Sequence, residues 1–330
     1  MTSGRCFGAV LLVAAAFTAV AGSVLVSHQP GQQFADFSYA PPMRPHLRDD
    51  EGRWRRPFVY PLRLANRMEH RFEENRREPV PLRWFSDGVV VSGDGPAGPW
   101  LPLGADALGR DILARVLLGA RLSLGVAVVA AAGALLLGTI VGGLAGFLGG
   151  RLDELLMRGS DLILVLPAIY LAIVLRATMP LVLSTSQVFW TLAGVLMMAG
   201  WPYPARGVRA VVAGERVKEY AEAARALGAG SWRILLRHLL PATRPFLGVQ
   251  LTLLLPAFIV SEATLSFVGF GFAEPAPSWG VMLQDAAQAG ALTDAPWLLA
   301  PAGAIVICVL ALHLLAESAT NGAAAGDKLT

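Results

Sequence analysis

Few residues in this chain have the type and spacing that catalysis or metal binding requires. The sequence holds two lysines, Lys218 and Lys328, and neither follows a glycine. A phosphate-binding loop needs a Gly-Lys pair, because its lysine reaches the phosphates of the nucleotide. No His-Glu-x-x-His, Gly-x-Ser-x-Gly or metal-spaced His/Cys cluster occurs. The sequence therefore predicts no catalytic residue, no metal site and no cofactor.

Glu262 is the one acidic side chain well inside a long apolar run. A carboxylate at the centre of a membrane-spanning helix costs about 2.5–3.5 kcal/mol, so it should face a bundle interior or water. Two interpretations stay open: a pore-lining or gate residue, or a protonated or hydrogen-bonded carboxyl that holds helices together. His313, in the last apolar run, is interpreted as a packing residue. Cys6 and Cys308 lie in or beside apolar runs and predict neither a disulfide nor a metal site.

The composition explains why so few candidate catalytic or metal-binding residues are found. Hydrophobic residues make up 55% of the chain and charged residues 15%, whereas soluble domains average roughly 25% charged. Uncharged runs cover residues 7–26, 122–150, 246–261 and 297–316. A bilayer core about 30 Å thick needs about 20 apolar residues per helix, and buried helices of a soluble protein would show polar faces. The sequence predicts a polytopic membrane protein.

Six transmembrane spans are expected. They cover about residues 7–26, 122–149, 159–179 (kinked near Pro167), 188–204, 245–272 and 297–316. Within the first span, Ala19-Val20-Ala21 resembles a signal-peptidase site, which would make this span a cleaved signal. The run is longer than the usual apolar region of a signal, so an uncleaved anchor over residues 1–27 is favoured.

Residues 28–118 differ in kind from the spans. They are rich in proline and carry 13 Arg against 12 Asp plus Glu. This composition predicts a soluble extramembrane segment, partly irregular and helical around residues 62–77. Residues 106–118 form a short amphipathic stretch that leads into the second span. An alternative places a sensor or enzyme domain in residues 28–100, although no catalytic pattern is visible there.

Charge asymmetry between loops predicts the orientation. Residues 205–244 contain eight Arg or Lys against three Glu, while the loops at 180–187 and 273–296 contain neither Arg nor Lys. The positive-inside rule places residues 205–244 in the cytoplasm, and long translocated segments are largely exempt from it. Four spans precede this loop, so the N-terminus and the tail at 318–330 are cytoplasmic and residues 28–118 periplasmic. The predicted topology thus accounts for where the arginines occur in the sequence. The excess of basic residues therefore does not indicate a nucleic-acid partner.

The cytoplasmic loop is predicted to fold as helix, tight turn, helix. Residues 215–227 are strong helix formers, and Gly228 can take the left-handed conformation that stops a helix. Ser231 can cap a second short helix, which Pro241 ends. A DNA-binding helix-turn-helix has a similar order of helix and turn residues. Membrane spans begin a few residues to either side of this loop, however, which argues against DNA binding. A passive connector has no need of 40 structured residues, so a docking element for a cytoplasmic partner fits best.

Three stretches carry a family resemblance. The loop contains Glu222-Ala223-Ala224, then Gly228, then the ending Arg237-His238-Leu239-Leu240-Pro241. It resembles the EAA loop of permeases in binding-protein-dependent ABC importers, and its Arg-His pair resembles the oligopeptide/dipeptide branch. Residues 102–124, before the second span, and 261–280, at the end of the fifth, are similar to the same branch. Ala242 departs from the branch's usual asparagine after the proline.

The resemblance implies an all-α, six-helix, type I ABC importer (MetI-like) permease fold in the bacterial inner membrane. Its transmembrane domain would cover residues 119–317 and include the coupling loop at 205–244. In the family this loop inserts into a cleft of the ATPase. The residues implied in coupling are Glu222, Ala223, Ala224, Gly228, His238, Leu240 and Pro241.

The implied partners are a homologous permease subunit, two cytoplasmic ATP-binding subunits that hydrolyse ATP, and an external solute-binding protein. The mechanism would be alternating access, and the chain itself would not be an enzyme. The alternative is an ATP-independent channel or secondary carrier, which typically shows broken helices in both halves. No internal repeat is seen here. The solute stays open among peptides, nickel chelates, opines and glutathione.

Overall fold

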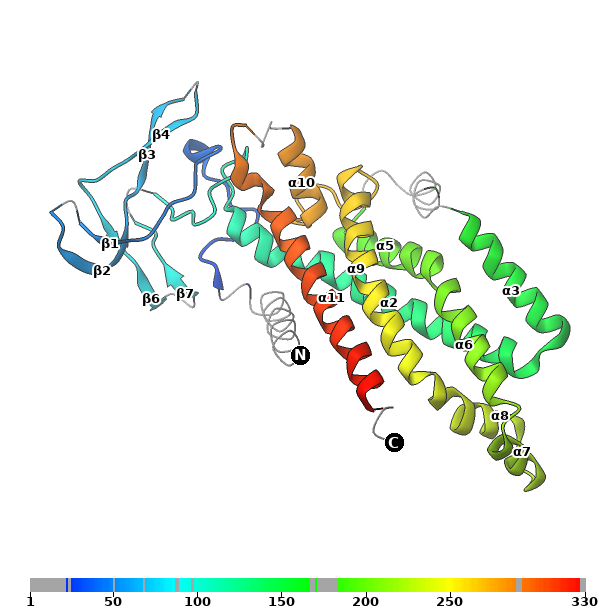
Figure 1. Ribbon diagram of the computed structural model, residues 1–330. Helices are drawn as coiled ribbons and strands as arrows, with labels where there is room; N and C mark the ends of the chain where they lie inside the picture. The colour runs from blue at the N-terminus through cyan, green and yellow to red at the C-terminus, as the bar shows by residue number, and fades with distance from the viewer. Residues whose placement is uncertain are drawn as a thin grey trace. The chain divides into compact units, whose positions relative to one another are not determined.

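The computed structural model describes residues 22, 25–49, 51–67, 69–86, 89–95, 98–166, 170, 183–288 and 293–326. The chain divides into two compact units (Figure 1). We call the first the helical unit; its described parts are Gly125–Leu265 and residues 309–326. The second, the β-containing unit, comprises the described residues up to Leu124 together with Ser266–Cys308.

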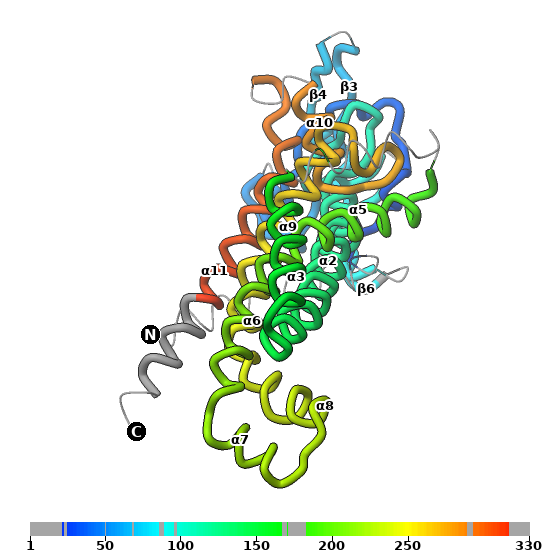
Figure 2. Tube along the Cα trace, turned by 90° about the vertical axis from the view of Figure 1, so that its right-hand side faces the viewer, coloured from blue at the N-terminus to red at the C-terminus, as the bar shows by residue number. Residues whose placement is uncertain are grey.

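In the order in which they follow one another along the chain, the helices are α2 (Ile112–Leu148), α3 (Gly150–Val165), α5 (Thr185–Gly200), α6 (Pro202–Glu215), α7 (Glu219–Ala226), α8 (Ser231–Ile234), α9 (Arg244–Phe267), α10 (Trp279–Gln288) and α11 (Ala300–Gly326). A π-helix, η2 (Leu235–Leu239), and a 3-10 turn, η3 (Leu240–Thr243), join α8 to α9. Figure 2 traces this path.

Three helical stretches in the described part of the chain are long and apolar enough to cross a membrane. They are Ile112–Leu148, Ser231–Phe267 and Pro296–Ala316. They agree in position with the expected spans at 122–149, 245–272 and 297–316, although α2 begins ten residues early. The expected spans at 159–179 and 188–204 overlap α3 and α5 only in part. The expected span at 7–26 and the kink at Pro167 fall largely or wholly outside the described residues.

The β-containing unit corrects the expectation of an all-α chain. Strands β1 (His46–Arg48), β2 (Trp54–Val59) and β5 (Val80–Pro81) form an antiparallel sheet in the order β1-β2-β5. Two antiparallel pairs accompany it: β3 (Leu62–Asn66) with β4 (Arg71–Glu74), and β6 (Arg83–Ser86) with β7 (Val89–Ser92).

The helix expected at residues 62–77 is wrong, because this region is the β3–β4 hairpin. Burial along β3 alternates between more and less buried residues, with Leu62 buried and Leu64 opposite Phe72 of β4. A period of two residues is the signature of a strand with one covered face. The many Glu and Arg residues favour a helix by propensity, but packing of alternate apolar side chains decides the structure.

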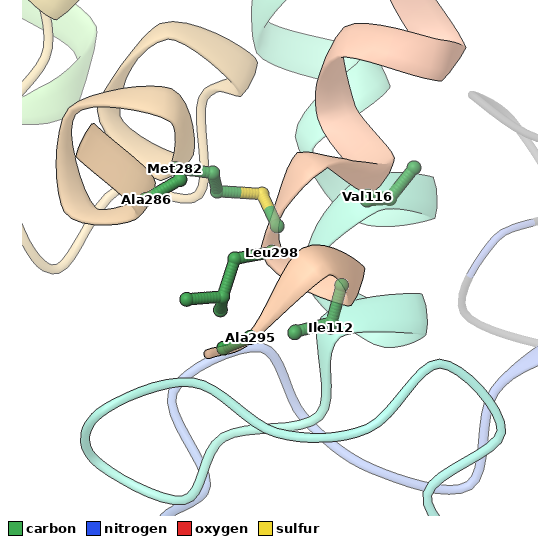
Figure 3. Packing of buried hydrophobic residues seen from close by; sticks show 6 residues of the cluster. All are labelled: Ile112, Val116, Met282, Ala286, Ala295 and Leu298. Atoms are coloured by element: carbon green, nitrogen blue, oxygen red, sulfur yellow. The ribbon is translucent and has the colours of Figure 1, made fainter. Parts of the chain in front are cut away.

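Two apolar clusters hold the β-containing unit together. One joins Ala40, Met43, Leu62, Leu101 and Ala105. The other joins the first turns of α2 to α10 and to the 3-10 turn η4 (Pro296–Leu299); its members are Ile112, Val116, Met282, Ala286, Ala295 and Leu298 (Figure 3). The start of α2 is fixed by Asp111, whose Oδ1 accepts the amide of Leu113 at 2.9 Å as a helix cap.

In the helical unit, α2 and α6 approach closely along a row of glycines. Gly138, Gly142 and Gly146 recur every four residues on α2. A Cβ atom at Gly142 would lie 2.1 Å from the carbonyl oxygen of Ala205, and one at Gly146 would lie 2.6 Å from that of Arg209. Small residues at this spacing allow backbone-to-backbone packing in lipid.

We expect Gly142→Ala to destabilise the protein, because its Cβ has no room against Ala205. Overpacking of a tight contact costs about 1–3 kcal/mol. The matched control is Gly194→Ala on α5, where a Cβ meets no atom within 4 Å. Thermal unfolding of the purified protein in lipid nanodiscs measures both. Equal melting temperatures for the two variants would show that the α2–α6 contact is not tight.

Candidate functional site

The segment between α6 and α9, residues 216–243, folds as two short helices across a glycine turn. Gly228 has φ 81°, and its amide donates to the carbonyl of Arg225 at 2.9 Å. The amide of Ala229 donates to the carbonyl of Ala224 at 3.0 Å, which completes the end of α7. A Cβ at Gly228 would meet nothing within 4 Å, so the backbone conformation alone requires glycine. The predicted role of Gly228 as a helix stop is confirmed.

Two details of the predicted loop are wrong. Ser231 is the first residue of α8 rather than its cap; Gly230 holds the cap position, without a side-chain hydrogen bond. Pro241 does not end the second helix. It lies at the start of η3, where a missing amide hydrogen leaves no helical bond unmade, and the helical path continues into α9.

The loop is seated on α6 by an apolar cluster. Buried Ala221 of α7 and buried Ile234, Leu235 and Leu239 pack with Val208 and Val212 of α6. Ala224 and Leu240 lie partly buried against the same cluster. This platform fixes the inner face of the loop, so the opposite face is presented as a defined surface.

Exposed apolar side chains cover the outer face of the loop. The relative exposure of Leu227 is 88%, of Trp232 66% and of Leu236 60%. Glu222, Ala223 and His238 are also exposed, whereas Pro241 is half-buried. Sequence reasoning identified the charged and small residues but missed these large apolar side chains, because their exposure depends on how the loop packs against α6.

Arginines fasten the loop to the neighbouring helices. Arg216 donates through Nη1 to the carbonyl of Phe147, near the end of α2, at 2.6 Å. Arg225 of α7 donates to the carbonyl of Arg216 at 3.0 Å. Arg209 of α6 pairs with Asp153 of α3 through two bonds of 2.5 and 2.6 Å. These contacts join the loop to the end of α2, and they join α6 to α3.

Glu262 of α9 is completely buried in the helical unit. Its burial confirms that the carboxyl faces the interior of the protein, as the energetic cost of exposure to lipid requires. Both interpretations of this residue, gate and structural carboxyl, are compatible with that position. His313 of α11 is exposed on this chain, so the expected packing of this residue stays a prediction. Cys308 is a free, buried thiol.

A second notable site lies in the β-containing unit, where five charged side chains cluster. Asp106, Arg110 and Arg115 precede or begin α2; Glu274 follows α9, and Asp285 lies on α10. Arg115 donates to Glu274 at 2.6 Å and also bonds Asp106, while Arg110 donates to Asp106 at 2.7 Å and bonds Glu274. Sequence reasoning missed this cluster, because its members come from segments about 160 residues apart.

Next to this cluster, His28 connects three segments. Its Nδ1 lies 2.9 Å from Asp111 Oδ2 and its Nε2 lies 3.1 Å from Asp94 Oδ1. Burial by itself lowers the pKa of His28, but the hydrogen bonds and charges of Asp111 and Asp94 outweigh it and raise the pKa to about 9. The ring is therefore charged at neutral pH and donates from both nitrogens, which ties the segment before β1 to the end of β7 and the start of α2.

Three long apolar helical stretches mark a membrane protein, and its loop between α6 and α9 exposes apolar side chains on the surface. Residues 134–321 match the family of binding-protein-dependent transport system inner membrane components. Because this match covers more than half of the chain, the protein belongs to that family.

Similar proteins place the chain within the oligopeptide/dipeptide permease branch of that family. The oligopeptide transport system permease protein OppC of Bacillus subtilis (strain 168) is 36% identical over 234 residues, 71% of this chain and 74% of the relative. The dipeptide transport system permease protein DppC of the same organism is 42% identical over 182 residues, 55% of each chain. OppC of Lactococcus lactis subsp. cremoris (strain SK11) is 31% identical over 208 residues, 63% of this chain and 69% of the relative.

Proposed function

We propose that this chain forms half of the translocation pathway of an ATP-driven importer for peptides or similar small solutes. It pairs with a homologous permease, two cytoplasmic ATP-binding subunits and an external solute-binding protein, and it works by alternating access in the bacterial inner membrane. The observation that carries this proposal is the loop at 216–243: its inner face is seated on α6, and its outer face exposes Leu227, Trp232 and Leu236. Membership of the transporter family supports the same conclusion.

The proposed topology follows from the charges of the loops. Six spans cross the membrane, with the anchor at 1–27, a transmembrane domain at 119–317 and a cytoplasmic tail at 318–330. Residues 28–118 are periplasmic, and the coupling loop at 205–244 is cytoplasmic. The positive-inside rule supports this orientation. The strands and the separate apolar cluster in residues 40–105 support an extramembrane location for that segment.

The proposed coupling residues have distinct roles in the loop. Glu222 and Ala223 on α7 and His238 in η2 are exposed and would contact the ATP-binding subunit. Gly228 sets the turn between the two helices, and Ala224, Leu240 and Pro241 support the loop from its partly buried side. Closure of the ATP-binding subunits would press on the exposed face and pass to α2 and α3 through Arg216 and Arg209.

The alternative is an ATP-independent channel or carrier. Such a protein has no use for a loop built to dock a separate subunit. The relatives named above are peptide transport permeases, which favours a peptide as the solute.

We expect Gly228→Val to abolish uptake while the protein still inserts, because a β-branched residue at φ 81° strains the turn. The matched control is Gly230→Val, where φ is −65° and a Cβ again meets nothing within 4 Å. Glu222→Lys, which reverses a charge on the exposed face of α7, should also abolish uptake. Uptake of a labelled peptide and co-purification of the ATP-binding subunit measure the outcome. Normal values for Gly228→Val and Glu222→Lys would show that the loop does not couple ATP hydrolysis to transport.

We further propose that Glu262 lines the pathway and acts as a gate. Glu262→Gln keeps the shape and hydrogen-bonding capacity but removes the charge, so uptake should fall at least several-fold with expression and melting temperature unchanged. A purely structural carboxyl predicts the reverse pattern: a silent Gln variant and a Glu262→Leu variant with reduced thermal stability, because partners are left unpaired. Unchanged uptake for Glu262→Gln would rule out the gate.

A further inference from the structure

The charge cluster in the β-containing unit is not balanced. It combines three carboxyl groups, those of Asp106, Glu274 and Asp285, with the two guanidinium groups of Arg110 and Arg115. Relative exposure is 1% for Arg115 and 4% for Asp106 and Arg110. The side chains of Asp285 and Glu274 are 30% and 38% exposed, so an excess negative charge there is only partly solvated, which favours the binding of a proton by a carboxyl group. With all five groups ionised the cluster carries one excess negative charge, which one bound proton removes.

Both oxygens of Asp106 are fully used as hydrogen-bond acceptors. Its Oδ1 accepts the amides of Leu108 and Arg110, each at 2.9 Å, and its Oδ2 accepts both guanidinium groups. The nearby Asp111 is also occupied, because its carboxylate faces the charged ring of His28.

The remaining pair, Glu274 and Asp285, differ in their access to the arginines. Glu274 accepts hydrogen bonds from Arg110 and Arg115, whereas Asp285 Oδ2 lies 3.6 Å from Arg110 Nη2 and 3.8 Å from Arg115 Nη1. Glu274 therefore takes most of the compensation that the arginines offer, and Asp285 is the carboxyl group left with the weaker contacts.

The pKa values of the pair agree with this geometry. Burial, followed by the charge of Glu274, raises the pKa of Asp285 to about 6 against the opposing effect of the arginines. Burial acts in the same direction on Glu274, but its hydrogen bonds and charge contacts with Arg110 and Arg115 lower its pKa overall. The proton therefore resides on Asp285.

We propose that Asp285 holds the excess proton of this cluster and forms, with Glu274 and the two arginines, an acid-sensitive latch that fastens α10 to the start of α2. Asp285 lies on α10 between Met282 and Ala286, which pack on the same cluster as Ile112 and Val116 (Figure 3). The side chains of Asp285 and Glu274 are 30% and 38% exposed, so protons reach them from solvent. Asp285 is the one ionisable side chain of α10, and loss of its proton adds a negative charge beside the arginines that Glu274 already pairs with, which weakens the attachment.

The latch makes stability depend on pH with a defined sign. The folded pKa of Asp285 lies above its ordinary value of 3.8, so between about pH 4 and pH 6 the folded protein binds more protons than the unfolded chain. Stability should therefore fall as pH rises through this window. His28 affects stability in a different pH range. Because its pKa is raised to about 9, its contribution to stability is fully present below about pH 6.5 and is lost as pH rises towards 9.

The test is thermal unfolding of the full chain in lipid nanodiscs at about pH 5 and about pH 6.5, below the range of His28. The wild type should melt a few degrees lower at the higher pH. Asp285→Asn keeps the shape of the side chain but cannot become charged, so it should remove the difference. Glu274→Gln balances the cluster at two negative and two positive charges and should remove it as well. Asp294→Asn, on a nearby exposed carboxylate, should retain it.

Infrared difference spectroscopy gives an independent reading that does not depend on how well a variant folds. The wild-type spectrum should show the loss of one protonated carboxyl band with a midpoint near pH 6, and Asp285→Asn should lack it. The proposal is overturned if the wild type shows no such band, or if the pH difference in melting persists in both Asp285→Asn and Glu274→Gln. The inference rests on the fold alone, so its failure would leave the transport function untouched.

Discussion

The backbone contact between α2 and α6 is the constraint on which the rest of the helical unit depends. Lipid provides no hydrophobic force between helices, so close packing through small residues must supply the attraction. Glycine at 142 brings α2 against Ala205, and this fixes the part of α6 that carries Val208, Arg209, Val212 and Arg216. Those residues in turn seat the loop and join it to α2 and α3. The structure of the loop is thus a consequence of helix packing in the helical unit.

The β-containing unit joins segments that are far apart in the sequence, and it does so without a long helix. It uses charge as well as apolar contact. Arg115, almost fully buried, bridges Asp106 before α2 and Glu274 after α9, and His28 bridges two carboxylates in the same unit. Buried charges of this kind are tolerated because each guanidinium and the imidazolium meet several acceptors. One carboxyl in excess leaves the unit responsive to acid.

The sequence predicted those features that depend on local pattern. Uncharged runs identified α2, α9 and α11, and Gly228 was recognised as a helix stop because left-handed conformation is a local property of glycine. The strand at 62–66 was missed because two signals disagree. The residue propensities favour a helix, the two-residue alternation favours a strand, and packing against β4 selects the strand. Pro241 was taken for a terminator, although the first turn of a helix tolerates it. The charge cluster and the exposed face of Leu227 and Trp232 could not be predicted from the sequence, because both depend on residues that come together only in the folded protein.

The central claim is that the loop at 216–243 faces the cytoplasm and the β-containing segment faces the opposite side. Cysteine labelling tests it most directly. In a background with Cys6→Ala and Cys308→Ala, Ala226→Cys at the exposed end of α7 and Leu47→Cys, 50% exposed on β1, are treated with a membrane-impermeant maleimide. In spheroplasts the account predicts labelling of Leu47→Cys at once and of Ala226→Cys only after permeabilisation. Labelling of Ala226→Cys in intact spheroplasts would contradict it.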